Sequence, residues 1–189
     1  MATLHLTTAA GCTLAIGRYP RFRYNASGGG GSGLGGELDP TGWQPLLFEP
    51  AGLAIPPLNW RTTRVGGLPL PPGLSISLLP QRLAGRWQPA SGAVELAFLA
   101  RFRFALAGIY QAPDLIVQTD LGTGAVQGQR HSASGQPLDG DGRGLLVGVA
   151  TVPPTGEGWL DRFLGLPEEA LAVLRCELRQ VGFRGPSEG

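Results

Sequence analysis

The sequence predicts a mainly β protein, a single-domain antiparallel β-sandwich or barrel with one short C-terminal helix. Residues 94–104 alternate strictly between apolar and other side chains. Shorter alternating runs recur along the chain and are separated by turns rich in Gly and Pro. A helical pattern appears only near the C-terminal end.

The run 94–104 is predicted to be a central strand. Side chains of a strand alternate between its two faces, so one face here is entirely apolar. That face consists of Val94, Leu96, Phe98, Ala100, Phe102 and Phe104. A single sheet cannot bury such a row, so a second layer or a closed barrel is required.

Other segments with the same alternation predict the remaining strands. They are 4–8, 12–16, 18–24, 74–79, 114–121, 125–131, 143–152 and 175–181, with a short strand within 59–65. Residues 159–164 suggest one helical turn, and Pro167 suits the first position of a helix that runs to about Leu174. We expect one domain over residues 1–182 and a tail over 183–189.

Residues 27–36, SGGGGSGLGG, are of low complexity and are predicted to form a flexible loop. They contain the spacing Gly31-x-Gly33-x-x-Gly36 of a dinucleotide fingerprint. That fingerprint requires a strand before it and a helix after it, whereas Pro40 and Pro45 follow here. The sequence therefore predicts no nucleotide site and no cofactor.

Residues 40–72 are rich in proline yet apolar, and are predicted to cover the sheet as an irregular segment. Such a segment can plug an open sheet edge, or it can stay exposed as a strip that a partner binds. The large aromatic residues of this segment and of its neighbourhood are the candidate partner- or ligand-binding residues. They are Trp43, Phe48, Trp60, Trp87 and Tyr110.

The formal net charge of +1 argues against a nucleic-acid partner. All basic residues are arginine, which excludes chemistry that needs a lysine. No basic-then-apolar leader follows Met1 and no apolar run is long enough to span a bilayer, so we expect a cytoplasmic protein without an integral membrane segment. Cys12 and Cys176 lie in apolar surroundings as buried thiols, and a disulfide between them stays open.

Candidate reactive residues are few. His5 and His131 are the only histidines and no metal-ligand spacing occurs, so no metal site is predicted. Asp139-Gly-Asp141-Gly resembles the start of a calcium loop but lacks its later ligands, so a hairpin turn is predicted. His131 lies near serines and acids, which leaves a small hydrolase as one hypothesis.

Two resemblances add expectations. Gly85-Arg86-Trp87 resembles the Gly-x-Trp of lipocalin-like barrels, although that motif opens the first strand there and lies mid-chain here. It implies a barrel that holds one apolar ligand.

Residues 110–119, 138–152 and 163–171 resemble conserved cyanobacterial and chloroplast-type proteins of unknown function. That likeness implies a photosynthetic organism and a peripheral place at the thylakoid surface.

Three functions follow as hypotheses. The first is a non-catalytic accessory, assembly or interaction protein that binds an unknown protein partner and is associated with photosynthesis. The second is a carrier of a small hydrophobic molecule in a barrel lumen. The third is the hydrolase that uses His131. An interior filled between Phe98, Phe102 and Phe104 would exclude the carrier, whereas an apolar cavity there would support it.

Overall fold

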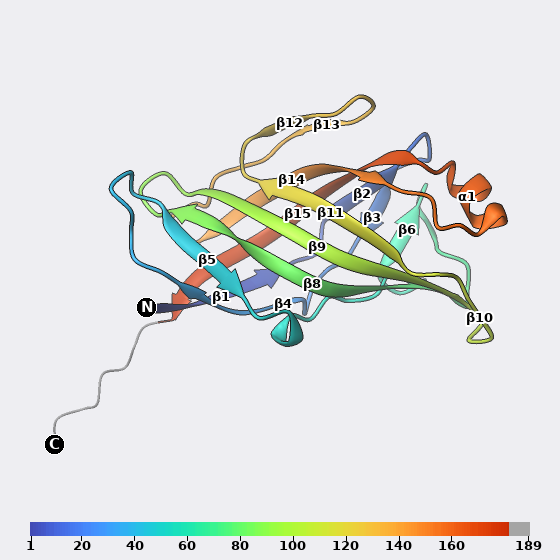
Figure 1. Ribbon diagram of the computed structural model, residues 1–189, viewed down its shortest axis with the longest axis horizontal. Coiled ribbons are helices and arrows are strands. Elements are labelled where there is room, and N and C mark those ends of the chain that lie inside the picture. Colours follow the sequence, from blue (N-terminus) through green and yellow to red (C-terminus); the bar gives the residue numbers. More distant parts are fainter. Residues whose placement is uncertain (182–189) are drawn as a thin grey trace, which may run out of the picture.

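A single antiparallel sheet dominates the computed structural model, which describes residues 1–181 (Figure 1). Its strands, with a small separate hairpin, are β1 (Ala2–Thr8), β2 (Cys12–Ile16), β3 (Phe22–Tyr24), β4 (Gly30–Gly35), β5 (Gln44–Phe48), β6 (Thr63–Val65), β7 (Leu68–Pro69), β8 (Leu74–Gln88), β9 (Ala93–Leu106), β10 (Tyr110–Gln111), β11 (Leu115–Gly122), β12 (Ala125–Gln127), β13 (Ser132–Ser134), β14 (Arg143–Val152) and β15 (Glu168–Val181). The helices of this part of the chain are the 3-10 turn η1 (Pro50–Gly52) and α1 (Gly158–Leu164).

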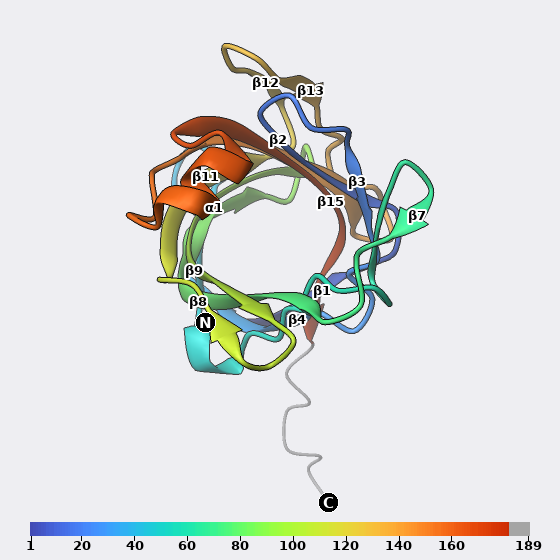
Figure 2. The ribbon, with the colours of Figure 1, turned by 90° about the vertical axis from the view of Figure 1, so that its right-hand side faces the viewer.

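The sheet closes on itself. Neighbouring strands follow the order β1-β4-β5-β8-β9-β11-β14-β15, and β15 then pairs with β1 from Thr3↔Val181 to Thr8↔Cys176. The view along the barrel shows the resulting ring (Figure 2). The predicted mainly β, antiparallel fold with one short helix near the C-terminus is confirmed, and closure makes it a barrel.

A second set of strands extends one half of the barrel. The first part of β15 pairs with β2, which pairs with β3, followed by β6 and β7. A bridge between Leu58 and Ile76 links this side back to β8. We call the end with the β2–β3 turn (17–21), β10 and α1 the mouth, and the end with the β8–β9 turn (89–92) and the 139–142 turn the base.

The alternation of the central strand is confirmed in β9. Val94, Leu96 and Ala100 are buried, whereas Glu95 is exposed. β9 pairs with β8 on one side and β11 on the other, so it lies in the middle of the sheet. The predicted strand 143–152 coincides with β14.

The prediction of a flexible loop over 27–36 is wrong, because residues 30–35 form β4, which pairs with both β1 and β5. The buried glycines of β4 are required by close packing. A Cβ on Gly33 would lie 2.6 Å from the ring of Phe48, and one on Gly31 would lie 2.6 Å from the carbonyl oxygen of Gly52. The glycine-rich sequence therefore belongs to a strand of the barrel wall, and side chains from neighbouring segments pack against its glycines.

The prediction of a helix from Pro167 to Leu174 is also wrong. The helix is α1, at the predicted turn 159–164, and Glu168 already begins β15. β15 pairs with β14 from Glu168 to Glu177 on one side and with β2 from Ala170 to Val173 on the other. The segment after Pro167 is therefore hydrogen-bonded to strands on both sides. The acidic first turn after Pro167 was a helix signal that sheet pairing overrode.

The proline-rich segment 40–72 contains more regular structure than predicted. Its residues 44–48 form β5, a wall strand between β4 and β8, and β6 and β7 follow later. The irregular part around 53–58 lies between these strands. The predicted tail 183–189 lies outside the described residues. No helix within residues 1–181 is long and apolar enough to cross a membrane.

Candidate ligand-binding cavity

The barrel encloses an apolar cavity with two lobes of about 150 Å3 each, an outer lobe toward the mouth and an inner lobe deeper in the barrel. Both lobes are bounded by Leu14, Phe102, Thr119 and Ala172, so they meet in the middle of the barrel. The inner lobe reaches toward the base, past Phe98 and Leu96, and the outer lobe reaches toward the mouth. Further outer-lobe residues are Phe22, Leu58, Ile76, Phe104, Val152 and Leu164.

The cavity exists because small residues occupy the inward positions of β14 and β15. On β14 these are Gly148 and Ala150, and on β15 they are Ala170 and Ala172. Toward the base, inward positions carry large side chains that pack into a core, and part of this core forms the floor of the inner lobe. The core consists of Leu4, Leu6, Leu46, Phe48, Leu83, Val94, Leu96, Leu121, Leu138, Leu146, Cys176 and Leu178. Side-chain size along the strands therefore decides which half of the barrel is filled.

Few polar groups face this cavity. The hydroxyl of Thr8 donates to the carbonyl oxygen of Ala26 at 2.7 Å, and that of Tyr24 donates to the carbonyl oxygen of Pro56. The hydroxyl of Thr119 forms no hydrogen bond with another residue of the described chain. Because Thr119 lies where the lobes meet, it can offer one hydrogen bond to a bound molecule in an otherwise apolar space.

The two cysteines are free thiols in buried positions. Cys176 lines the inner lobe, and burial raises the pKa of its thiol to about 12. Burial likewise raises the pKa of Cys12, whose Sγ donates to the carbonyl oxygen of Ala9 at 3.2 Å. Neither thiol is ionised at neutral pH, so Cys176 acts as an apolar wall group and Cys12 as a core residue rather than as nucleophiles.

Helix α1 lies at the mouth, and Leu164 forms part of the wall of the outer lobe (Figure 2). The carboxylate of Asp161 accepts hydrogen bonds from the backbone N–H and the hydroxyl of Thr155, at 2.6 and 2.5 Å. The bond from the backbone N–H fixes the loop before the helix. Aromatic contacts attach the helix to both sides of the mouth. These are Tyr19–Phe163, with ring centroids 5.9 Å apart, and Tyr110–Trp159, at 5.5 Å.

The five predicted binding residues do not come together, and none of them bounds either lobe. Phe48 is only 1% exposed and belongs to the base core, and Trp87 packs against that core. Trp43 lies under the guanidinium of Arg86, 4.4 Å from its ring centroid. Trp60 is exposed on the outer surface, and Tyr110 accepts a hydrogen bond from Trp159 Nε1 at the mouth.

The ring of His131 forms no hydrogen bond with a serine, cysteine or carboxylate among residues 1–181. Its backbone N–H donates to Glu169 at 2.6 Å, and its Nε2 is buried without a partner. This geometry gives the hydrolase hypothesis no support, because a catalytic histidine must reach a nucleophile. Residues 1–181 contain no group of three or more metal-binding side chains placed to hold an ion.

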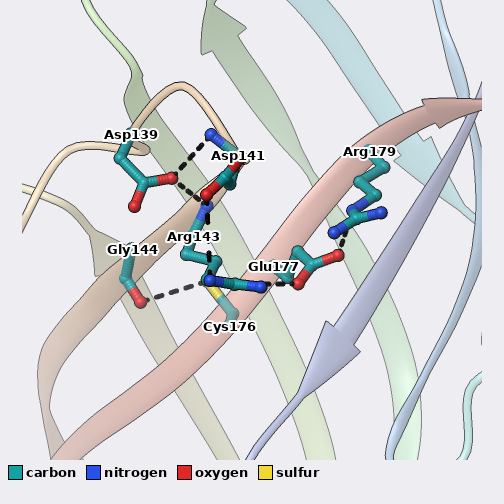
Figure 3. Close-up of polar contacts among 7 residues, drawn as sticks. All are labelled: Asp139, Asp141, Arg143, Gly144, Cys176, Glu177 and Arg179. Atoms are coloured by element: carbon teal, nitrogen blue, oxygen red, sulfur yellow. Dashed lines mark hydrogen bonds and ion pairs between the residues drawn. The ribbon is translucent and has the colours of Figure 1, made fainter.

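The 138–142 segment is a turn at the base, as predicted, and its acids serve the turn and nearby ion pairs (Figure 3). Asp139 accepts from the backbone N–H groups of Asp141 and Arg143, both at 2.9 Å. The guanidinium of Arg143 reaches Glu177 at 3.4 Å, and Glu177 also contacts Arg179. Asp139 is thus engaged by the turn itself rather than turned toward a cation.

Sequence reasoning identified the inward row of β9, including Phe98, Phe102 and Phe104, but missed the opposite wall of the cavity. The missing signal was the series of alanines and glycines on the even-numbered positions of β14 and β15. Comparison with family models, with curated proteins and with solved structures finds no match to this chain.

Proposed function

We propose that the protein binds one apolar small molecule in the barrel lumen and acts as its carrier. The observation that carries this proposal is a pair of adjoining apolar lobes that share Phe102 and Ala172 and are closed toward the base by a packed core. Lobes of about 150 Å3 each can hold a ring or a chain segment, since an engineered protein cavity of about that size binds benzene. A molecule that occupies both adjoining lobes would be elongated.

The ligand class follows from the wall. Apolar side chains dominate both lobes, so the bulk of the molecule is hydrocarbon, and Thr119 offers a place for one neutral polar group. Within residues 1–181, no arginine or acid bounds either lobe, so a charged group would be buried there without a partner. The ligand is therefore neutral where it lies in the lumen.

The resemblance to cyanobacterial and chloroplast-type proteins leads us to include a cytoplasmic setting, with the thylakoid surface as a peripheral site, in this proposal. The accessory or interaction function stays a separate hypothesis. No single contact of the described residues favours a particular protein partner.

The test is a fluorescence titration with a neutral polyene alcohol as the probe. Ala172→Phe places a large side chain where the two lobes meet and should reduce probe affinity at least about tenfold, because the probe would have to displace it. Ala97→Phe is the matched control, since Ala97 alternates with the inward row of β9 and lies on the outer face. Unchanged affinity in folded Ala172→Phe, or equal losses in both variants, would contradict lumen binding.

A further inference from the structure

The mouth of the barrel exposes more large apolar side chains than a surface exposed only to water requires. Ile109 is 92% exposed and Phe163 is 60% exposed, and Tyr19, Leu106 and Trp159 are also exposed. We call these five residues the apolar rim. Single exposed apolar residues are ordinary on protein surfaces, whereas a contiguous group points to a contact surface.

The apolar rim is contiguous because α1 connects its parts. Trp159 and Phe163 are four residues apart and lie on one side of the helix. Phe163 contacts Tyr19 on the β2–β3 turn, and Trp159 contacts Tyr110 on β10. Tyr110 pairs with Leu106 and follows Ile109 directly. The rim therefore runs across the mouth, beside the outer lobe that Leu164 of the same helix bounds.

Positive charge accompanies the rim. Arg18 and Arg21 flank Tyr19, and Arg162 lies on α1 between the two rim aromatics. All three are exposed, and none forms an ion pair with an acid of the described chain. Two carboxylates lie nearby: that of Asp161 is engaged by the backbone N–H groups of residues 155 and 156, and that of Glu157, at the start of α1, makes no capping hydrogen bond, so the three arginines leave positive charge in excess.

The base has the opposite character. Its arginines are already paired, since Arg86 contacts Glu95 at 2.7 Å and Arg143 contacts Glu177 at 3.4 Å (Figure 3). Further acids are exposed in its turns, namely Glu37, Asp39, Asp139 and Asp141. A negative surface would therefore attract the mouth and repel the base, which orients the barrel.

We propose that the mouth docks on a lipid bilayer that contains anionic headgroups, with the apolar rim inserted at the interface. Trp and Tyr side chains with flanking arginines are suited to this boundary, where rings enter the apolar layer and guanidinium groups meet phosphates. The cavity would then open toward the membrane, and its ligand would exchange with the bilayer rather than with water. That last step rests on the proposed lumen function, whereas docking alone does not.

Vesicle flotation tests the docking. We expect the protein to float with phosphatidylcholine vesicles that contain about 30% phosphatidylglycerol, more weakly with pure phosphatidylcholine, and less as salt is added. The double variant Ile109→Ser/Phe163→Ser should lose at least about tenfold in vesicle affinity, because both side chains would leave the apolar layer. Both residues are exposed, so the fold should persist.

Matched controls use exposed residues away from the mouth. Leu34→Ser/Leu47→Ser changes two exposed leucines on the outside of β4 and β5 and should leave vesicle affinity unchanged. Arg21→Gln/Arg162→Gln should lower affinity several-fold on anionic vesicles only, whereas Arg82→Gln on β8 should have no effect.

Two outcomes would overturn the docking proposal. One is the absence of flotation with either composition, which would indicate that the rim faces a protein instead. The other is equal loss in the rim variant and in the leucine control. Probe titration of Ile109→Ser/Phe163→Ser in water separates this proposal from lumen binding, because its lumen affinity should stay normal while vesicle affinity falls.

Discussion

The base and the mouth of the barrel are built from the same long strands, yet one is filled and the other is hollow. On β9, Val94 and Leu96 near the base are each 3% exposed. The larger Phe98 and Phe102, further along the same face, are only partly buried, and Phe102 borders both lobes of the cavity whereas Leu96 borders only the inner one. Burial thus falls as side-chain size rises, which is the reverse of what close packing alone would produce.

The difference lies in the partners across the lumen. Near the base, Leu4 and Phe48 fill the space inside the barrel wall, whereas nearer the mouth Gly148, Ala150 and Ala172 leave it open. Such an arrangement costs stability, because aromatic side chains that could pack fully do not. A bound molecule would restore those contacts, which is why the comparison bears on function.

The largest expected effect comes from truncating one phenylalanine in each half. Phe48→Ala should lower the free energy of unfolding by about 3–5 kcal/mol, as for other fully buried phenylalanines. Phe102→Ala should cost about half of that or less, since part of its ring already faces an open space. Urea denaturation of both variants without ligand checks this. Equal losses would mean that the cavity is filled in solution.

The strand alternation of β9 and β14 was readable from sequence because one apolar face follows a period of two. That rule states which side chains point inward, but it does not state whether they meet. Meeting depends on strands that are distant in sequence, such as β9 and β15, and no local pattern contains their spacing. The fold class was therefore predictable, whereas the cavity was not.

Two local rules failed where tertiary pairing outweighed them. The glycines of β4 looked like a linker, yet their missing side chains make room for Phe48 and Leu53 from neighbouring segments. The segment after Pro167 looked like a helix start, yet it lies between β14 and β2. The aromatic candidates Trp43 and Trp60 lie outside the cavity, because each packs against the guanidinium of an arginine.

A glycine substitution sharpens the comparison at the filled end. Gly33→Ala would place a Cβ 2.6 Å from Phe48, so it should destabilise the barrel by about 1–3 kcal/mol. Leu34→Thr is the control, because Leu34 lies on the exposed face of β4 and should change stability by no more than about 0.5 kcal/mol.

Thermal melts compare these two variants with the double variant Gly33→Ala/Phe48→Ala. If the ring is what the new methyl group meets, the loss in the double variant should be clearly smaller than the sum of the single losses. Additive losses, or a neutral Gly33→Ala, would favour the flexible-loop prediction for this segment instead.

The smallest expected effect concerns the β12–β13 hairpin, which lies outside the barrel wall near β14 (Figure 1). Glu169 accepts hydrogen bonds from the backbone N–H groups of Gln129, Arg130 and His131. Partial burial would raise the pKa of Glu169, but these donors outweigh it and keep the pKa below its ordinary value.

Because the folded pKa of Glu169 is lowered, the hairpin attachment should be complete above the ordinary glutamate pKa and weaken as the pH falls through the lowered value. Glu169→Gln should mimic the protonated state at neutral pH. We expect faster amide hydrogen exchange at residues 129–131 with little change in the melting temperature of the barrel, since the attachment is local and solvent-exposed.

Glu168→Gln is the control, because Glu168 meets the side chain of Arg130 rather than these amides. Equal acceleration in both variants, or exchange that does not respond to pH in the wild type after correction for the intrinsic rate, would show that the carboxylate of Glu169 does not fix the hairpin. The barrel wall would then position it through the backbone of Gln136, whose N–H donates to the carbonyl oxygen of Leu145 on β14 at 2.9 Å.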